Sequence, residues 1–176
     1  MNLTKALAAD GWSEQIELEY LASAASKSKV IAELGSWKGR STLAMAENTE
    51  GIVFAVDVWE DNPLQPTGMG MRGGIFEEFQ RNTRGVTNIC PVVLYTPVAA
   101  YAMTRAGVKF DLIFIDACHT FEAVSLDIML WRPLLNPGGI LCGHDFVGDF
   151  PGVAIAVKQL IPKFRVINSI WTTEVE

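Results

Sequence analysis

The sequence predicts an α/β protein whose mostly parallel sheet is covered by helices on both faces. Apolar, β-prone runs alternate with segments of helical apolar spacing about five times along the chain. The β-prone runs are apolar at nearly every position, as in residues 52–56, which is typical of strands buried on both faces. Parallel strands joined through helices are expected to form right-handed crossovers.

The N-terminal half supplies the first of these alternations. The apolar spacing predicts a helix over about residues 10–27, with Asp10 or Ser13 as its cap. A strand, a helix and a second strand are expected to follow, in residues 29–37, 40–49 and 51–59. Residues 60–74 contain two prolines and four glycines, so they are predicted as a loop. Within it, residues 65–74 are a candidate lid or acceptor-recognition segment, with a disordered surface loop as the alternative.

The C-terminal half continues the alternation. Pro97 is expected to open a helix, because proline is favoured in the first helical turn. Asp127 is expected on the solvated face of a later helix, with a contact to the site loop as the alternative. In order, we expect helix 75–83, strand 88–96, helix 97–107, strand 109–116, helix 121–135, turn 136–139, strand 140–146, helix 151–161, and one last strand or a tight pair in 163–176.

Composition limits the classes of function. The chain has 176 residues, of which 49% are hydrophobic and 19% are charged, which excludes a disordered chain and favours one domain over residues 1–176. The net charge is −6 and no long basic run is present, so a surface that tracks nucleic-acid phosphates is not expected. Small molecules or other protein chains are the favoured partners, and a homodimer is left open.

The N-terminal sequence and the cysteines bear on the compartment. Residues 1–30 lack a basic start followed by a long apolar core, and no run approaches the roughly 18 apolar residues of a membrane span. The three cysteines lie far apart without a CxxC pair, which favours free thiols over a zinc site. We therefore expect a cytoplasmic protein.

Polar or glycine-rich residues follow five of the predicted strands. In open parallel sheets, ligands bind at the carboxyl ends of the strands, where these residues would meet. The residues concerned are Glu33 to Ser41, Asp57, Thr96, Asp116 to His119, and His144 to Asp145. The sequence therefore predicts one binding site at this edge of the sheet.

The first of these strand ends, "ELGSWKGRST", is a glycine-rich turn that enters a helix. Gly35 and Gly39 would let a ligand approach the backbone closely, although a plain strand-to-helix turn also needs glycine. The spacing is neither G-x-G-x-x-G nor that of a P-loop, which disfavours a dinucleotide enzyme and a phosphate cradle. Asp57 lies 18 residues after Gly39, a spacing that suits an acid bound to ribose hydroxyls, with a loop or capping aspartate as the alternative.

The chain has only two histidines, and each lies near an aspartate at a predicted strand end. His119 follows Asp116, and His144 precedes Asp145. A histidine titrates near neutrality and suits a general base, and a neighbouring carboxylate could orient it. The alternative is that both are loop residues satisfied by the backbone.

Four ordered motifs resemble the class I S-adenosylmethionine-dependent methyltransferases. They are "VIAELGSWKGRSTLAMA", "FAVDVW", "FDLIFIDACHTFEAVSLDIMLWRPLLNPGGILCGHDF" and "PGVAIAVKQL", and the match spans roughly residues 28–162. The sequence is most similar to the small O-methyltransferase-like branch with "IDxxH" and "HD" signatures. This resemblance implies a Rossmann-like three-layer α/β/α sandwich of six to seven strands with an antiparallel edge strand, and S-adenosylmethionine as cofactor.

The resemblance also implies which residues contact the cofactor. Asp57 would hold the ribose, with Val58 and Trp59 near the adenine. Two departures from the family pattern are Thr96, where an acidic or polar residue often touches the adenine edge, and Ala117-Cys118 in place of Gly-Asp. The implied cofactor-binding residues are Glu33, Gly35, Ser36, Gly39, Ser41, Thr42, Asp57, Val58, Trp59, Thr96, Asp116 and Ala117.

The catalytic residues implied are Asp116, His119, His144 and Asp145, with a histidine as base. Some relatives bind a divalent metal at these two strand ends, here through Asp116, His144 and Asp145. A metal is not favoured, because a set containing histidine leans away from Mg²⁺.

The predicted function is methyl transfer from S-adenosylmethionine, to a hydroxyl oxygen of a small molecule. The alternative is a non-catalytic S-adenosylmethionine-binding or assembly module. A nicotinamide oxidoreductase is disfavoured by the glycine spacing. The sequence does not identify the acceptor.

Overall fold

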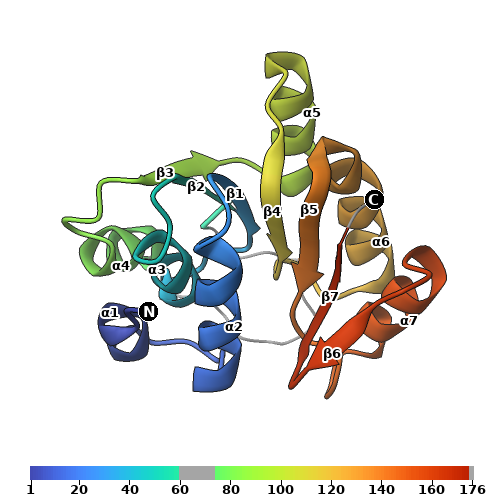
Figure 1. The fold of residues 1–176 in the computed structure, drawn as a ribbon, viewed down its shortest axis with the longest axis horizontal. Coiled ribbons are helices and arrows are strands. Elements are labelled where there is room, and N and C mark those ends of the chain that lie inside the picture. Colours follow the sequence, from blue (N-terminus) through green and yellow to red (C-terminus); the bar gives the residue numbers. More distant parts are fainter. Residues whose placement is uncertain (60–73, 175–176) are drawn as a thin grey trace.

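A computed structural model describes residues 1–59 and 74–174 of the chain. Its elements alternate as predicted for an α/β protein (Figure 1). They are α1 (Thr4–Ala8), α2 (Gln15–Ala25), β1 (Val30–Leu34), α3 (Arg40–Ala46), β2 (Ile52–Asp57), α4 (Ile75–Asn82), β3 (Ile89–Val93), α5 (Thr96–Ala106), β4 (Phe110–Ile115), α6 (Phe121–Trp131), the 3₁₀ turn η1 (Arg132–Leu134), β5 (Leu135–Gly143), α7 (Pro151–Leu160), β6 (Arg165–Ile167) and β7 (Ile170–Glu174).

The described strands form one seven-stranded sheet in the order β3-β2-β1-β4-β5-β7-β6. Strands β1 to β5 pair in parallel, whereas β7 runs antiparallel to both β5 and β6. The prediction of a mostly parallel sheet with an antiparallel edge strand is confirmed. The C-terminal segment forms the predicted tight pair, and β6 has only three residues.

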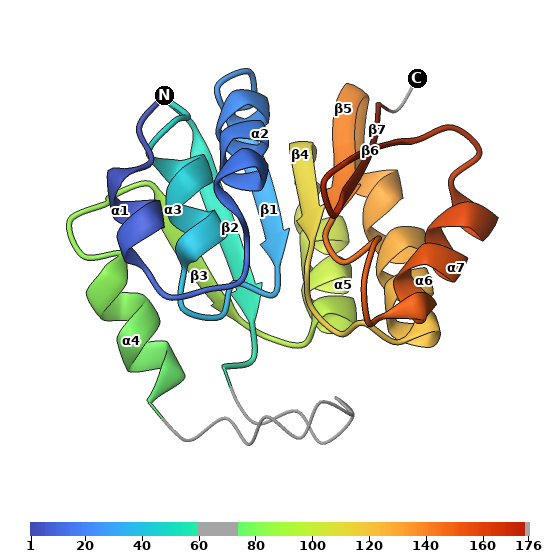
Figure 2. The same ribbon diagram turned by 90° about the horizontal axis from the view of Figure 1, so that it is seen from below.

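Helices cover both faces of the sheet, because alternate strand residues point to opposite faces (Figures 1 and 2). In β4, Leu112 and Phe114 pack with α2 and α3, while Ile113 packs with α5, α6 and α7 on the other face. A third cluster joins α1 to α2 and α3. The strands are therefore apolar at nearly every position for the reason that the sequence suggested.

Three local predictions need correction. The helix expected over residues 10–27 begins at Gln15, and Glu14 caps it through a capping box with Glu17, in place of Asp10 or Ser13. The turn predicted at 136–139 lies inside β5, where pairing with β4 is irregular. Asp127 is buried rather than solvated. The candidate lid over residues 65–74 lies outside the described residues except for Gly74.

The described part of the chain contains no helix that is both long and apolar enough to cross a membrane.

Candidate active site

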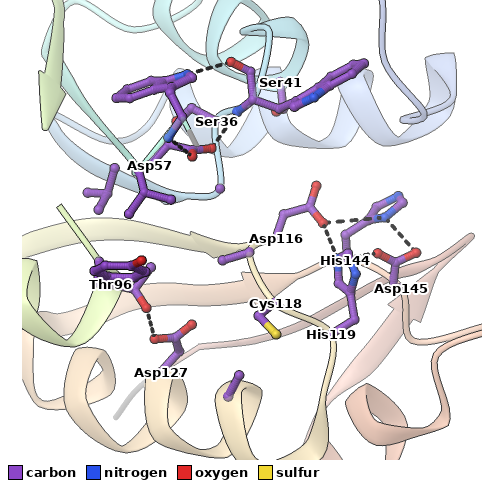
Figure 3. Close-up of a pocket in the computed structure, with 18 of the residues that line it drawn as sticks. Ser36, Ser41, Asp57, Thr96, Asp116, Cys118, His119, Asp127, His144 and Asp145 are labelled. Carbon is purple, nitrogen blue, oxygen red and sulfur yellow. Dashed lines mark hydrogen bonds and ion pairs between the residues drawn. The ribbon is translucent and has the colours of Figure 1, made fainter. Parts of the chain in front are cut away.

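A cavity of about 830 Å³ lies at the carboxyl ends of the parallel strands (Figure 3). Its wall includes residues that follow each of β1 to β5, together with Gly11, Trp12 and Ser13 before α2, and one face of α6. The prediction that the polar strand ends meet in one place is therefore confirmed. The predicted residues that line the cavity are Gly35, Ser36, Ser41, Asp57, Val58, Trp59, Thr96, Asp116, Ala117, His119, His144 and Asp145.

The glycine turn after β1 packs directly against the loop after β4. Gly35 has φ of 91°, and a Cβ at this position would lie 2.1 Å from the carbonyl oxygen of Asp116. The Gly35 amide donates a hydrogen bond to the Val56 carbonyl at 2.8 Å, which also ties the turn to β2. Only glycine allows both the positive φ and the close approach, so Gly35 sets how the turn after β1 meets the loop after β4.

Replacing Gly35 with alanine should destabilise the fold more than the same change at Gly85. Gly85 has a similar φ of 82° but nothing within 4 Å of an added Cβ, so Gly85→Ala should cost only about 1–2 kcal/mol from backbone strain. The clash at Gly35 should add about 2 kcal/mol or more. Urea unfolding measures the free energy of unfolding of the two variants. An equal loss of this free energy in both would contradict the close packing of Gly35.

Glu33 lies behind this turn rather than in the cavity wall. It is fully buried and accepts hydrogen bonds from Ser41 Oγ at 2.5 Å and from Thr42 Oγ1. Burial raises the pKa of Glu33 to about 7, although these hydroxyls oppose the shift. Glu33, Gly39 and Thr42 are not among the residues that line the cavity, so the structure shows them as supports of the turn.

Asp57, at the end of β2, is oriented by backbone amides. Its Oδ2 accepts a hydrogen bond from the amide of Trp37 at 2.9 Å, and its Oδ1 accepts one from the amide of Trp59 at 2.7 Å. Burial raises the pKa of Asp57, and the amide donors oppose that shift. Each carboxylate oxygen has a second lone pair, so the group can still accept bonds from a ligand diol.

The segment before α2 closes one side of the cavity, which sequence reasoning missed. The rings of Trp12 and Trp37 are in contact, with centroids 4.2 Å apart and their planes tilted by 33°. Arg40 holds the segment through hydrogen bonds from Nε to the Ser13 carbonyl at 3.0 Å and from Nη1 to the Ala9 carbonyl at 2.7 Å. No local pattern predicts this contact, because the residues lie far apart in sequence.

The two histidines and their aspartates form one cluster (Figure 3). His119 Nε2 lies 3.0 Å from Asp145 Oδ2 and 3.5 Å from Asp116 Oδ1. His144 Nδ1 lies 3.3 Å from Asp145 Oδ1 and 3.9 Å from Asp116 Oδ1. The His119 ring also packs on Phe150, with centroids 4.4 Å apart. The structure thus brings together all four residues predicted as catalytic.

The carboxylates favour the charged form of both imidazoles. Burial alone would lower the pKa of His119, but Asp116 and Asp145 raise it to about 10. Burial would also lower the pKa of His144, but its interactions with Asp145 and Glu17 raise that pKa to about 11. Burial raises the pKa of Asp116, whereas the histidines outweigh burial at Asp145 and hold its pKa well below the usual range.

Glu17 on α2 is a member of this cluster that the sequence did not reveal. It is 1% exposed, and its Oε2 lies 3.0 Å from His144 Nε2. Its Oε1 accepts hydrogen bonds from the Asn168 side chain at 2.9 Å and from the Ser169 amide at 3.0 Å. Glu17 therefore fixes the His144 ring with Nδ1 turned toward the two aspartates.

Three residues of this cluster could together hold a metal ion. Asp116, His144 and Asp145 each offer one ligand atom, and these atoms lie within 4.8 Å of one another. A proton on His144 Nε2 that is donated to Glu17 would leave the Nδ1 lone pair for a metal. One nitrogen and two carboxylates suit Mn²⁺, Fe²⁺ or Zn²⁺ better than Mg²⁺.

Thr96 and Asp127 form a second polar pair on the cavity wall, apart from the histidine cluster (Figure 3). Thr96 Oγ1 donates a hydrogen bond to Asp127 Oδ1 at 2.5 Å. The Thr96 carbonyl in turn accepts a bond from Trp131 Nε1 at 3.1 Å, which fixes the start of α5 against α6. Asp127 therefore belongs to the cavity and not to a solvated helix face.

The sheet order and the cleft together define the class I methyltransferase fold. Residues 32–146, more than half of the chain, match the family described as "Methyltransferase domain", so the chain belongs to this family. The predicted class of S-adenosylmethionine-dependent methyltransferases is thereby confirmed, and the match favours an enzyme over a non-catalytic module.

Solved structures with the same fold include several methyltransferases. The calicheamicin methyltransferase CalS11 has a TM-score of 0.69 at 16% identity, over 97% of this chain and 78% of that chain. An O-methyltransferase from Bacillus cereus in complex with S-adenosylhomocysteine has a TM-score of 0.71 at 14% identity, over 98% of this chain and 87% of that chain. Cofactor-bound Rv0187 from MTB has a TM-score of 0.70 at 17% identity, over 98% of this chain and 87% of that chain.

Proposed function

We propose that this protein transfers a methyl group from S-adenosylmethionine to a hydroxyl oxygen of a small molecule. The observation that carries the proposal is that one cavity holds both Asp57, an oriented carboxylate suited to a ribose diol, and the cluster of His119, Asp116 and Asp145. In this proposal the end of the cavity at Asp57 would bind the nucleoside, and the end at His119 would accept the proton that methylation of a hydroxyl releases.

The residues around the turn after β1 would bind and orient the cofactor. Gly35 and Ser36 would approach its amino-acid part through the backbone, and Asp57 would accept hydrogen bonds from the ribose hydroxyls. S-adenosylmethionine supplies an electrophilic methyl group on a sulfonium, and the electron pair of the broken C–S bond stays on sulfur. Asp116, with its pKa raised by burial, lies where a carboxylate would balance that positive charge.

His119 is the candidate base by geometry. It lies beside the cavity, is held between two carboxylates, and makes no hydrogen bond of good geometry through Nε2 among the described residues. In the proposed step the acceptor oxygen bonds to the methyl carbon, and the hydroxyl proton moves to the neutral form of His119. Because the pKa of His119 is about 10, this form is the minor one at neutral pH, and turnover should rise with pH up to that value. Asp145 would stabilise the imidazolium that results.

A divalent cation is a second way to activate the hydroxyl. Asp116, His144 and Asp145 would hold it, with Glu17 bonded to the far nitrogen of His144. Such a cation would lower the pKa of a coordinated hydroxyl. Whether one is needed is decided by the chelator test below.

The size of the cavity supports a small acceptor. CalS11 is described as a TDP-rhamnose 3′-O-methyltransferase, and hydroxyls of sugars are therefore the first acceptors to test. The absence of nucleic-acid partners, a cytoplasmic location, a homodimer and a single domain over residues 1–176 stay predictions.

The proposal is tested by following S-adenosylhomocysteine formation from S-adenosylmethionine with a panel of nucleotide sugars, catechols and hydroxy acids. We expect release of S-adenosylhomocysteine only with a hydroxyl-bearing acceptor. Loss of turnover in EDTA, with recovery on adding Mn²⁺ or Mg²⁺, would show that a metal activates the hydroxyl. Full turnover in EDTA would assign activation of the hydroxyl to His119 without a metal. Binding of the cofactor without transfer to any acceptor would favour the non-catalytic alternative.

A further inference from the structure

Asp127 is a buried carboxylate without a charged partner. It lies on α6, is 2% exposed, and contributes to the cavity wall. Thr96 bonds to its Oδ1, whereas Oδ2 has no hydrogen-bond partner in the part of the chain that the structure describes. A buried polar group that keeps a free acceptor facing a cavity is suited to a ligand that donates a hydrogen bond there.

The fold alone gives no reason for an acid at this position. Burial raises the pKa of Asp127 to about 6, and only the hydroxyl of Thr96 opposes that shift. An aliphatic side chain would pack against α5 without this desolvation penalty. The penalty is offset if a bound ligand supplies a donor to Oδ2.

The cavity wall near Asp127 indicates the shape of that ligand. Leu94 lies next to Asp57, since its amide donates to the Asp57 carbonyl at 3.2 Å, and Leu126 precedes Asp127 on α6. Val58 and Ala117 also line the cavity. These four side chains give the cavity wall apolar surface, which suits the faces of a flat heteroaromatic base.

We propose that Asp127, oriented by Thr96, accepts a hydrogen bond from the exocyclic amino group of the cofactor's adenine and selects it against a base that carries oxygen at that position. This inference rests on the proposed cofactor site. It assigns recognition of the adenine to helix α6, through Asp127, which lies 31 residues after its hydrogen-bond partner Thr96 in the chain. With hypoxanthine in place of adenine, the carboxylate would face a carbonyl oxygen, and neither group could donate.

The test compares S-adenosylhomocysteine with S-inosylhomocysteine by calorimetry. Wild-type protein should prefer the adenine compound by at least about tenfold. In Asp127→Asn, the amide can donate to the oxygen of hypoxanthine, so the preference should fall about tenfold or more. Thr96→Val should reduce the preference less, because it only removes the orienting donor.

Controls separate the possible outcomes. Asp149→Asn makes the same change at an exposed residue that does not line the cavity, and it should keep the wild-type preference. An unchanged preference in Asp127→Asn, with the melting temperature retained, would overturn the role of Asp127 and leave the cofactor site intact. Failure of wild-type protein to bind S-adenosylhomocysteine would overturn the proposed function together with this inference.

Discussion

Replacing His119 with glutamine is expected to reduce turnover by about 100- to 10,000-fold, the usual contribution of a general base. Glutamine keeps a polar side chain of similar length but cannot take up a proton at neutral pH. The dissociation constant for S-adenosylhomocysteine should stay within about threefold of wild type, because His119 lies in the acid–histidine cluster, whereas the ribose is proposed to bind at Asp57. Release of S-adenosylhomocysteine, measured with the best acceptor from the panel, gives the turnover.

The matched control is Glu17→Gln, which leaves His119 in place and changes the residue that contacts His144. Glu17 also closes the capping box of α2, and glutamine can fill that role too. Among the described contacts, Glu17 reaches the aspartates through the His144 ring, so its role is to position that ring. This variant should retain more activity than His119→Gln, and the affinity for added Mn²⁺ should fall if a metal binds. Equal turnover in wild type and His119→Gln would remove His119 from the mechanism.

Replacing Asp57 with asparagine is expected to weaken binding of S-adenosylhomocysteine by about 10- to 100-fold. Hydrogen bonds to a charged acceptor contribute about 1.5–3 kcal/mol, and the neutral amide loses that charge. Asparagine is preferred to alanine because its one oxygen can keep one of the two hydrogen bonds that Asp57 accepts from the amides of Trp37 and Trp59, whereas alanine would lose both. Calorimetry measures the affinity, and circular dichroism checks that the fold is kept.

The 2′-deoxy form of S-adenosylhomocysteine shows whether the loss arises at the ribose. Wild-type protein should bind the deoxy compound more weakly than the parent, whereas Asp57→Asn should discriminate much less between them. If the ratio of the two dissociation constants, deoxy compound to parent, is the same in both proteins, Asp57 supports the fold of the turn without contacting the ribose.

The strand and helix alternation was predictable because it depends on local periodicity. Runs such as residues 52–56 are apolar at every position because both sheet faces are covered, and the glycine turn and Asp57 follow directly from these strands. The start of α2 was misplaced because Glu14 caps it through its bond with Glu17, a pairing that the sequence pattern did not distinguish from capping by Ser13.

The site was predictable only where its residues follow strands. Asp116, His119, His144 and Asp145 come together because carboxyl ends of parallel strands share one edge of the sheet. Glu17 reaches the cluster from a helix 127 residues before His144, and no local spacing indicates such a contact. Asp127 was misassigned because an acid on a helix is usually solvated, and only the packing of α5 on α6 shows that this one is buried.

A crystal structure with bound S-adenosylhomocysteine tests the central claim most directly. We predict that its ribose hydroxyls lie against Asp57, that its base lies between Asp57 and Asp127, and that its sulfur faces Asp116 and His119. Density for the compound outside this cavity, or a sulfur directed away from the cluster, would contradict methyl transfer at this site.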